Sequence, residues 1–278
     1  MAGRLSGAGR LVVCATPIGN LEDVTLRVLG ALREADVIAC EDTRRTRKLL
    51  DRYGIRAPLV SYHEHNEERR AAELVERMQS GAVVALVSDA GMPLISDPGY
   101  VLVRACVAAG VAVEVLPGPS AALAALVASG LPADHWRFEG FLPRRAGDLR
   151  RVLALGGAAT LVAFESPHRL GATLRVLADL DPERPVAVCR ELTKVHEEVA
   201  RGTAAELADR FGEGAPRGEV VLVVGGAADR PGGDDGPSSD AVDAVTRLVE
   251  AGAKPRAAAS VVAELTGESA NSLYRAVL

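Results

Sequence analysis

The sequence predicts an α/β protein with two α/β domains and a small helical module at the C-terminal end. Short apolar runs alternate with segments whose apolar residues recur at helical spacing, which is typical of parallel βαβ units. The runs at residues 37–40 and 83–87 are almost wholly apolar, as expected for strands covered on both faces. Gly, Pro, Ser and Asp gather directly after several of these runs, where open α/β sheets bind ligands.

The first domain is expected over residues 11–118. Its strands are expected at residues 11–15, 37–40, 59–62, 83–87 and 113–116. The helices between them are expected at residues 25–35, 43–53, 67–79 and 100–109. Gly54 follows the basic second helix as a natural C-terminal cap.

The second domain is expected over residues 119–226. Its strands are expected at residues 160–164, 185–190 and 220–225, with an extra antiparallel strand near 195–200. Its helices are expected after residue 120 and at residues 167–180 and 203–211. The sequence TAAE at residues 203–206 fits a capping box, which fixes the start of the last of these helices.

The ends of the chain differ in composition from the two domains. Residues 1–10 lack an apolar signal region and are expected to be a disordered lead-in. Residues 227–239 are rich in Gly, Pro, Asp and Ser and are expected to be a linker. Residues 240–278 form the helical module, with helices at 240–251, 255–265 and 269–278. A module of this size has a marginal core, so it is expected to pack on another surface.

Composition excludes several classes of protein. A net charge of −5 argues against a protein that wraps naked nucleic acid, and 3% aromatic residues argue against a base-stacking platform. The four isolated cysteines are expected to be buried thiols, which suits the cytoplasm. No apolar run is long enough to span a membrane. Neither a membrane nor DNA is therefore expected as a partner.

Common catalytic motifs are missing from the chain, and a twelve-residue loop is the segment that indicates a function. The chain has no Walker A, HExxH or GxSxG sequence, and no GxGxxG after its first strand. The histidines of residues 63–67 do not have zinc spacing, and no metal is expected. Residues 88–99, SDAGMPLISDPG, form a long loop after an apolar strand. Asp89 is interpreted as functional, whereas Asp97 is equally explained as a turn or cap residue.

Eight segments in a fixed order carry a resemblance to a known family. They are TPIGN (16–20), EDTRRT (41–46), SYHEHNE (61–67), SDAGMPLISDPG (88–99), PGPSA (117–121), GFLPR (140–144), ESPHR (165–169) and CRELTKVHEE (189–198). With these segments the chain resembles the tetrapyrrole-methylase superfamily. Within it the chain is similar to bacterial enzymes that methylate the ribose 2′-hydroxyl of a cytidine in the decoding region of 16S ribosomal RNA.

The resemblance implies two α/β domains with S-adenosylmethionine in the cleft between them, and a homodimer. The residues it places against the cofactor are Pro17, Ile18, Asp89, Met92, Ile95, Ser120, Ala121 and Phe164. The other partner is 16S rRNA, within the small ribosomal subunit. The superfamily also contains small-molecule enzymes, so a tetrapyrrole methyltransferase and a non-catalytic RNA-binding assembly factor stay as alternatives.

A ribose hydroxyl needs a group that removes its proton before it attacks a methyl donor. Glu165 and Lys194 are the hypothesised catalytic residues, because both follow predicted strands of the second domain. The competing interpretation is that Glu165 and Arg169 form a structural pair.

Basic residues beside the motif loops are expected to contact RNA phosphates. These residues are Arg44 and Arg45 at the start of the basic helix, and Arg144 and Arg145 after the GFLP sequence.

Overall fold

The computed structural model describes residues 9–154, 157, 159–212, 214, 216–226, 237–266 and 268–277. Residues 1–8 of the expected lead-in and residues 227–236 of the expected linker lie outside the described residues. The chain divides into two units, residues 1–228 and residues 229–278. In the described part, no helix combines the length and the apolar character that crossing a membrane requires.

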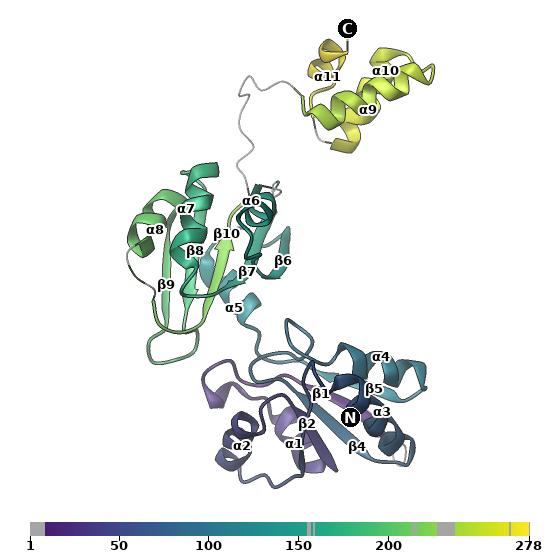
Figure 1. Cartoon of the computed structure of the whole chain (residues 1–278), viewed down its shortest axis with the longest axis vertical. Coiled ribbons are helices and arrows are strands. Elements are labelled where there is room, and N and C mark those ends of the chain that lie inside the picture. Colours follow the sequence, from purple (N-terminus) through teal and green to yellow (C-terminus); the bar gives the residue numbers. More distant parts are fainter. Residues whose placement is uncertain are drawn as a thin grey trace. The chain divides into compact units, whose positions relative to one another are not determined.

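The first sheet of the larger unit has five strands in the order β3-β2-β4-β1-β5, all parallel to their neighbours (Figure 1). The strands are β1 (Arg10–Cys14), β2 (Val37–Cys40), β3 (Leu59–Ser61), β4 (Val83–Val87) and β5 (Ala112–Leu116). The predicted positions of these strands and their parallel arrangement are confirmed. All five carboxyl ends therefore meet at one edge of the sheet.

Helices cover both faces of this sheet. They are α1 (Leu26–Glu34), α2 (Thr43–Arg52), α3 (Glu67–Gln79) and α4 (Tyr100–Ala108), with a short 3-10 helix, η1 (Leu21–Asp23). Val12 and Cys14 of β1 pack with α1 and α2, while Leu11 and Val13 pack with α3 and α4. This alternation explains why the inner strands β2, β4 and β1 are almost wholly apolar: their side chains enter one of two cores.

The second sheet is mixed, with the strand order β6-β7-β10-β8-β9. Its strands are β6 (Trp136–Phe141), β7 (Thr160–Glu165), β8 (Pro185–Arg190), β9 (Glu198–Thr203) and β10 (Val220–Val224). The predicted antiparallel strand is confirmed as β9, three residues later than expected. Central β10 is also antiparallel to both neighbours, so its first residue lies at the edge where β7 and β8 end.

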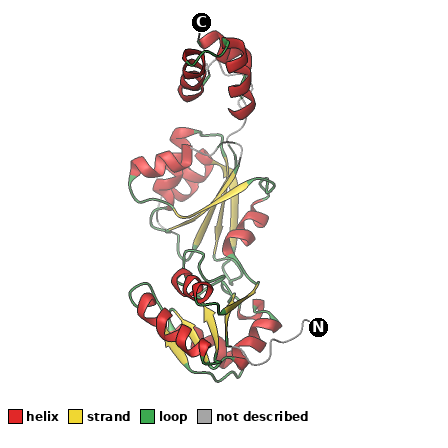
Figure 2. Ribbon diagram, turned by 90° about the vertical axis from the view of Figure 1, so that its right-hand side faces the viewer, coloured by secondary structure: helices red, strands yellow, loops and turns green. Residues whose placement is uncertain are grey.

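Helices α6 (Ala146–Ala154), α7 (Leu170–Leu180) and α8 (Ala204–Gly212) cover one face of this sheet, and α5 (Ala121–Ser129) covers the other (Figure 2). The capping box of α8 is confirmed, since Thr203 and Glu206 each accept the other's backbone N–H. Strand β6 and helix α6 were not predicted. The alternating aromatic and charged residues from Trp136 to Glu139 are the strand signal that was overlooked.

Helix α5 joins the two sheets in sequence and in packing. Ala122, Ala125 and Leu126 pack against the second sheet. Ile18, from the loop after β1 of the first sheet, is buried in the same cluster. The two sheets are thus connected by a shared apolar core near the carboxyl ends of their strands.

The smaller unit holds the predicted helices as α9 (Ser239–Glu250), α10 (Pro255–Thr266) and α11 (Ala270–Ala276). Val245, Ala259, Val262 and Leu273 form its own small core. The four cysteines are free and buried, as expected.

Candidate functional site

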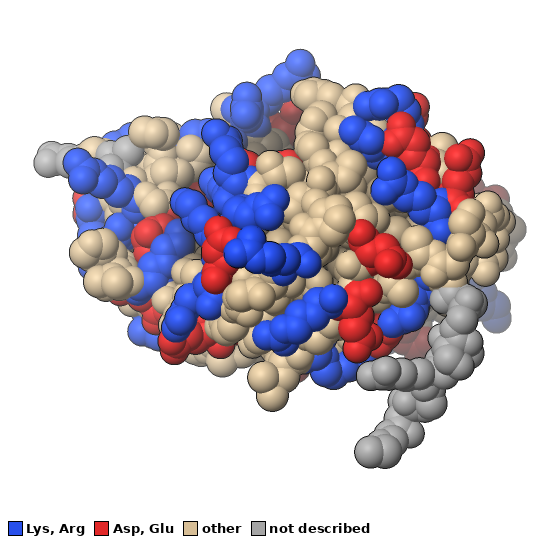
Figure 3. Space-filling view, turned by 90° about the horizontal axis from the view of Figure 1, so that it is seen from below, with Lys and Arg blue, Asp and Glu red and all other residues tan. Residues whose placement is uncertain are grey.

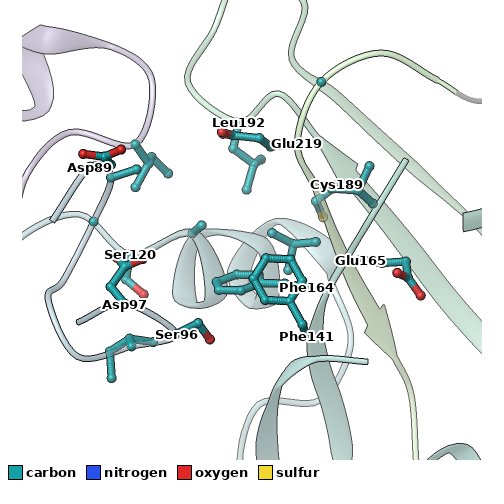
Figure 4. Close-up of a pocket in the computed structure, with 18 of the residues that line it drawn as sticks. Asp89, Ser96, Asp97, Ser120, Phe141, Phe164, Glu165, Cys189, Leu192 and Glu219 are labelled. Carbon is teal, nitrogen blue, oxygen red and sulfur yellow. The ribbon is translucent and has the colours of Figure 1, made fainter. Parts of the chain in front are cut away.

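The larger unit contains a cavity of about 590 Å³ lined by both sheets. It lies at the carboxyl ends of β1, β2, β4, β5, β7 and β8, and at the first residues of antiparallel β10. Figure 4 shows Asp89, Asp97 and Ser120 on one side, and Phe164, Cys189 and Glu165 on the other. The volume is in the range of small-molecule sites. The cavity therefore lies at the edge of both sheets where the sequence predicted a ligand site.

Two loops beside the cavity have strained backbones. Among the described residues, the non-glycine residues with positive φ are Leu94 (74°), Ser96 (65°), Glu191 (50°) and Thr193 (66°). The first pair belongs to the loop after β4, and the second pair to the loop after β8. Such conformations cost energy and persist where the surrounding structure enforces them, often at functional sites. Both loops are fixed in shapes that a relaxed turn would not adopt.

The side of the cavity that belongs to the first sheet is acidic. Burial, and then the negative charge of Asp89, raise the pKa of Glu41. Burial, and then the charge of Glu41, raise the pKa of Asp97 to about 6. Asp89 accepts a hydrogen bond from the Asp42 backbone N–H at 3.0 Å and lies 3.5 Å from Arg45. This side of the cavity favours a positively charged ligand group, and one carboxyl titrates near neutral pH.

The opposite side is apolar and aromatic. Phe164 lies between Phe138 and Phe141, with ring centroids 5.1 and 5.4 Å away. Cys189 and Leu192 complete this wall, and burial raises the pKa of the Cys189 thiol to about 11. The thiol is therefore protonated and apolar in character rather than nucleophilic.

The first turn of α5 contributes a different feature to the cavity. Ser120 caps the helix by accepting a hydrogen bond from the Leu123 N–H at 3.4 Å, and Ser120 and Ala121 both line the cavity. The positive end of a helix dipole favours an anionic group such as a carboxylate.

Most of the residues that the resemblance placed against a cofactor line this cavity. They are Ile18, Asp89, Met92, Ile95, Ser120, Ala121 and Phe164. Pro17 is buried beside Ile18 and is not among the lining residues. Sequence reasoning considered Glu41 only as one of several candidate bases, did not identify Phe141, and left Asp97 undecided. The available signals were the place of Glu41 directly after β2, of Asp97 in the loop after β4, and of Phe141 after the motif glycine Gly140.

Glu165 borders the cavity, but its carboxylate is occupied by structural contacts. It accepts hydrogen bonds from the Ser166 backbone N–H (2.7 Å), the Thr173 hydroxyl (2.6 Å) and Arg169 (3.2 Å). Figure 4 shows it turned away from Asp89 and Ser120. The pairing of Glu165 with Arg169, weighed as the alternative, is confirmed. These three donors argue against the hypothesised role of Glu165 as the base, which itself stays a prediction.

Lys194 is not a lining residue of the cavity, and it is held protonated. Its Nζ donates to Glu191 (2.7 Å) and to Glu219 (3.0 Å). Burial lowers the pKa of Lys194, but the hydrogen bonds to these carboxylates outweigh it and hold the pKa above its usual value. A protonated ammonium cannot accept the proton of a hydroxyl, so the geometry argues against Lys194 as the base.

The four arginines expected to contact RNA occupy different environments. Arg44 is exposed and pairs with Asp42 at 2.8 Å. Arg45 lines the cavity beside Asp89, so it is not a purely external contact. Arg144 and Arg145 are exposed in the segment after β6. On the face drawn in Figure 3, basic side chains are intermingled with acidic ones.

Two loops from different sheets meet beside the cavity. The Asn20 N–H donates to the Thr193 hydroxyl at 3.0 Å. A Cβ on Gly19 would lie 2.6 Å from Lys194 Cγ and 2.9 Å from the Leu192 carbonyl oxygen. Only glycine permits this close approach between the TPIGN loop and the loop after β8.

Comparison with known proteins identifies the class to which this fold and site belong. Residues 10–208 match the model of the family described as Tetrapyrrole (Corrin/Porphyrin) Methylases. The chain belongs to this family of methylases.

The most similar curated proteins narrow the class. Ribosomal RNA small subunit methyltransferase I of Mesorhizobium japonicum is 47% identical over 272 residues, covering 96% of this chain and 91% of the relative. The protein of that name from Mycobacterium bovis is 47% identical over 277 residues, covering 98% and 95%. The one from Thermotoga maritima is 46% identical over 219 residues, covering 78% of this chain and 99% of the relative. That relative is about as long as residues 10–226.

Solved structures share the fold. Uroporphyrin-III-C-methyltransferase from Thermus thermophilus aligns with a TM-score of 0.57 at 29% identity, covering 78% of this chain and 94% of that chain. The methyltransferase CobJ aligns with a TM-score of 0.61 at 24% identity, covering 81% and 98%. The predicted fold class, two α/β domains of this type, is confirmed.

Proposed function

We propose that this chain transfers the methyl group of S-adenosylmethionine to the ribose 2′-hydroxyl of a cytidine in the decoding region of 16S rRNA. The observation that carries the proposal is 47% identity to ribosomal RNA small subunit methyltransferases I over 96–98% of this chain, together with a cavity at the family's expected ligand edge. The eight ordered motifs support the choice of cytidine and of the ribose oxygen.

The residues around the cavity fit S-adenosylmethionine. Asp89 and its neighbouring carboxyls suit the ammonium and sulfonium charges, and the first turn of α5 suits the carboxylate. The wall of Phe164 and Leu192 suits the adenine ring and excludes water. A structure of the Thermus thermophilus uroporphyrin methyltransferase, described as complexed with S-adenyl homocysteine, shares this fold.

S-adenosylmethionine supplies a methyl group that is already activated by the sulfonium, so the protein mainly aligns the reacting atoms. In the proposed reaction Asp97 accepts the proton of the ribose hydroxyl. The ribose oxygen bonds to the methyl carbon while the carbon–sulfur bond breaks, and the electron pair stays on sulfur. Asp97 afterwards releases the proton to water.

Geometry supports Asp97 over Asp89 and Glu219. Asp97 lines the cavity on the strained loop after β4, whereas Asp89 is engaged by Asp42 and Arg45, and Glu219 by Lys194. A base works best when its pKa is near the working pH, and the pKa of Asp97 is raised to about 6. Glu165 and Lys194, the bases first hypothesised, keep structural and electrostatic roles in this proposal.

The RNA side of the site is formed by Arg44, Arg45, Arg144 and Arg145. Exposed arginines contact phosphates through bidentate hydrogen bonds and make binding sensitive to salt. Because the chain is acidic overall, these few contacts suit a folded ribonucleoprotein. The proposed substrate is therefore 16S rRNA within the small ribosomal subunit, in the cytoplasm.

A homodimer is part of the proposal. Val115 of edge strand β5 and Leu123 and Val127 of α5 are 54%, 50% and 80% exposed. Large apolar side chains on an unpaired edge strand and the next helix favour association with a second copy.

Methyl transfer from labelled S-adenosylmethionine tests the proposal. Small ribosomal subunits, naked 16S rRNA and a tetrapyrrole precursor are compared, and the modified position is mapped by nuclease digestion. Ribose methylation of a cytidine in the subunit is expected. Methylation of the tetrapyrrole alone would support the small-molecule alternative, while tight cofactor binding without any transfer would support a non-catalytic assembly factor.

A further inference from the structure

One aromatic side chain at the mouth of the cavity is exposed without an evident structural reason. Phe141 is 65% exposed and lines the cavity, whereas its neighbours Phe138 and Phe164 are partly buried in the second core. The chain has four phenylalanines, and three of them gather here. The low aromatic content argued against base stacking, but it did not reveal that the few rings are concentrated at one site.

An irregularity of β6 turns Phe141 toward the cavity. Phe138 pairs with Val162 of β7, and Phe141 pairs with Phe164, so three steps on β6 match two on β7. In a regular strand, residues three apart point to opposite faces. The extra residue, with Gly140 at φ 63°, forms a bulge and brings Phe138 and Phe141 to the same face as Phe164.

The backbone after Phe141 is held in place by the ESPHR motif. Arg169 donates to the carbonyl oxygens of Leu142 (3.0 Å) and Pro143 (2.7 Å). Buried Glu165 binds the same guanidinium at 3.2 Å, so its carboxylate fixes the group that holds this segment. The Leu142 N–H also donates to the Phe164 carbonyl at 3.1 Å. Phe141 is therefore a fixed ring on a braced segment.

We propose that Phe141 stacks on the nucleobase of the nucleotide that is methylated, with Arg144 and Arg145 contacting its flanking phosphates. This inference rests on the proposed function and adds a specificity residue to it. An aromatic ring accepts the flat face of an unstacked base, and sequence-specific recognition of RNA commonly uses such stacking on splayed-out bases. The exposed position at the mouth suits an incoming base, whereas partly buried Phe164 lies deeper in the wall.

The test compares Phe141→Ala, Phe141→Leu and Phe141→Tyr with the wild-type protein. Methyl transfer to small ribosomal subunits gives kcat and KM, and calorimetry without RNA gives the Kd for S-adenosylmethionine. Replacement by Ala or Leu is expected to raise KM for the subunit roughly 5- to 150-fold, the range of one base–aromatic contact, with the cofactor Kd within about twofold. Phe141→Tyr, which keeps a flat ring, is expected to restore the wild-type KM.

The matched control is Tyr100→Ala. Tyr100 is 64% exposed on α4 and does not line the cavity, so its loss is expected to leave both constants unchanged. Phe141→Leu removes the flat ring but keeps an apolar side chain beside Phe164. It therefore tests the inference even if Phe141→Ala unfolds. Melting temperatures identify an unfolded variant.

Two results would overturn the inference while leaving the proposed function intact. One is an active wild-type protein whose subunit KM is unchanged by Phe141→Ala and Phe141→Leu. The other is a weakened cofactor Kd without RNA, which would assign the ring to the adenine of the cofactor. A wild-type protein that binds the cofactor and methylates no ribosomal RNA would instead overturn the proposed function, and this inference with it.

Discussion

Single residues around the cavity have environments that their sequence positions do not disclose. Asp97 and Glu165 are both carboxyls of the motif segments, and burial raises the pKa of Asp97 to about 6. Three donors occupy the carboxylate of Glu165. Asp97 is therefore suited to proton transfer, and Glu165 to holding the groups that donate to it, because the two carboxylates have different surroundings.

Replacing Asp97 by Asn is expected to lower kcat by about 10²- to 10⁴-fold, the usual contribution of a positioned base. The wild-type rate is expected to fall as the pH drops through about 6, where Asp97 becomes protonated. Burial, and then the charges of Glu41 and Asp89, raise this pKa, while a hydrogen bond with the Ser88 hydroxyl lowers it. The pH at which the rate falls therefore depends on all of these groups. A pH–rate series on both proteins checks this, and a variant that keeps the same acidic limb would contradict it.

The same substitution is expected to raise stability. The pKa of Asp97 is raised from 3.8 to about 6 on folding, so the folded protein binds more protons than the unfolded chain between these values. The ionised carboxylate therefore destabilises the fold above pH 6, and this penalty disappears as the pH falls below about 4. Thermal melts at pH 7 should show Asp97→Asn about 2 °C or more above wild type. Asp209→Asn, on the exposed face of α8, is the control.

Glu165→Gln is expected to weaken the fold by about 1–3 kcal/mol, because a buried charge-assisted network loses its charge. Urea unfolding followed by circular dichroism measures this change. The pH profile of the surviving activity should keep the acidic limb of the wild type. Disappearance of that limb would return Glu165 to the role of base.

At the scale of elements, loops from different sheets define the site. The loop after β1 reaches the second core through Ile18, and it touches the loop after β8 through Gly19 and Asn20. These contacts couple the cavity's acidic side to its apolar side. The cavity is therefore formed by loops from both sheets together, and not by any single helix or strand.

Gly19→Ala is expected to weaken binding of S-adenosylmethionine roughly tenfold, because the new methyl group collides with the backbone of the loop after β8. Gly30→Ala is the matched control. Its Cβ meets nothing within 4 Å in the middle of α1, so it is expected to stabilise the fold by about 0.5–1 kcal/mol. Calorimetry and melting curves measure both variants. Equal cofactor affinity in the two would show that the close approach has no role in binding.

At the scale of the whole molecule, the chain divides into two units, and the larger one is expected to fold without the smaller one. The Thermotoga maritima relative is matched over 99% of its length by 219 residues, about the length of residues 10–226. The smaller unit has its own core in α9, α10 and α11. Both observations indicate that the larger unit folds without the helical module.

Removal of residues 227–278 is accordingly expected to leave the cofactor Kd within about twofold, because every residue lining the cavity lies in the larger unit. Calorimetry on the shortened and full chains makes the comparison. A loss of cofactor binding in a folded shortened chain would mean that the module supports the site.

The proposed dimer is tested by placing charges on its apolar surface. Leu123→Glu with Val127→Glu is expected to convert a particle of twice 29.0 kDa into a monomer, as measured by light scattering. The same pair of changes at Val261 and Leu265, which are exposed on α10, is the control. A wild-type protein that is monomeric at micromolar concentration would contradict this part of the proposal.

The sequence by itself determined every strand and helix of the described residues except β6, α6 and the short η1, and the edge of the sheets at which the cavity lies. Local patterns suffice for this, because the apolar runs of β2 and β4 and the capping box of α8 depend on neighbouring residues alone. The tertiary structure decided which motif residues work together. The antiparallel direction of β10, the bulge that turns Phe141, and the divergence of Asp97 from Glu165 depend on long-range pairing and burial. A pKa or a side chain's direction follows from everything packed around it, and that packing exists only in the folded chain.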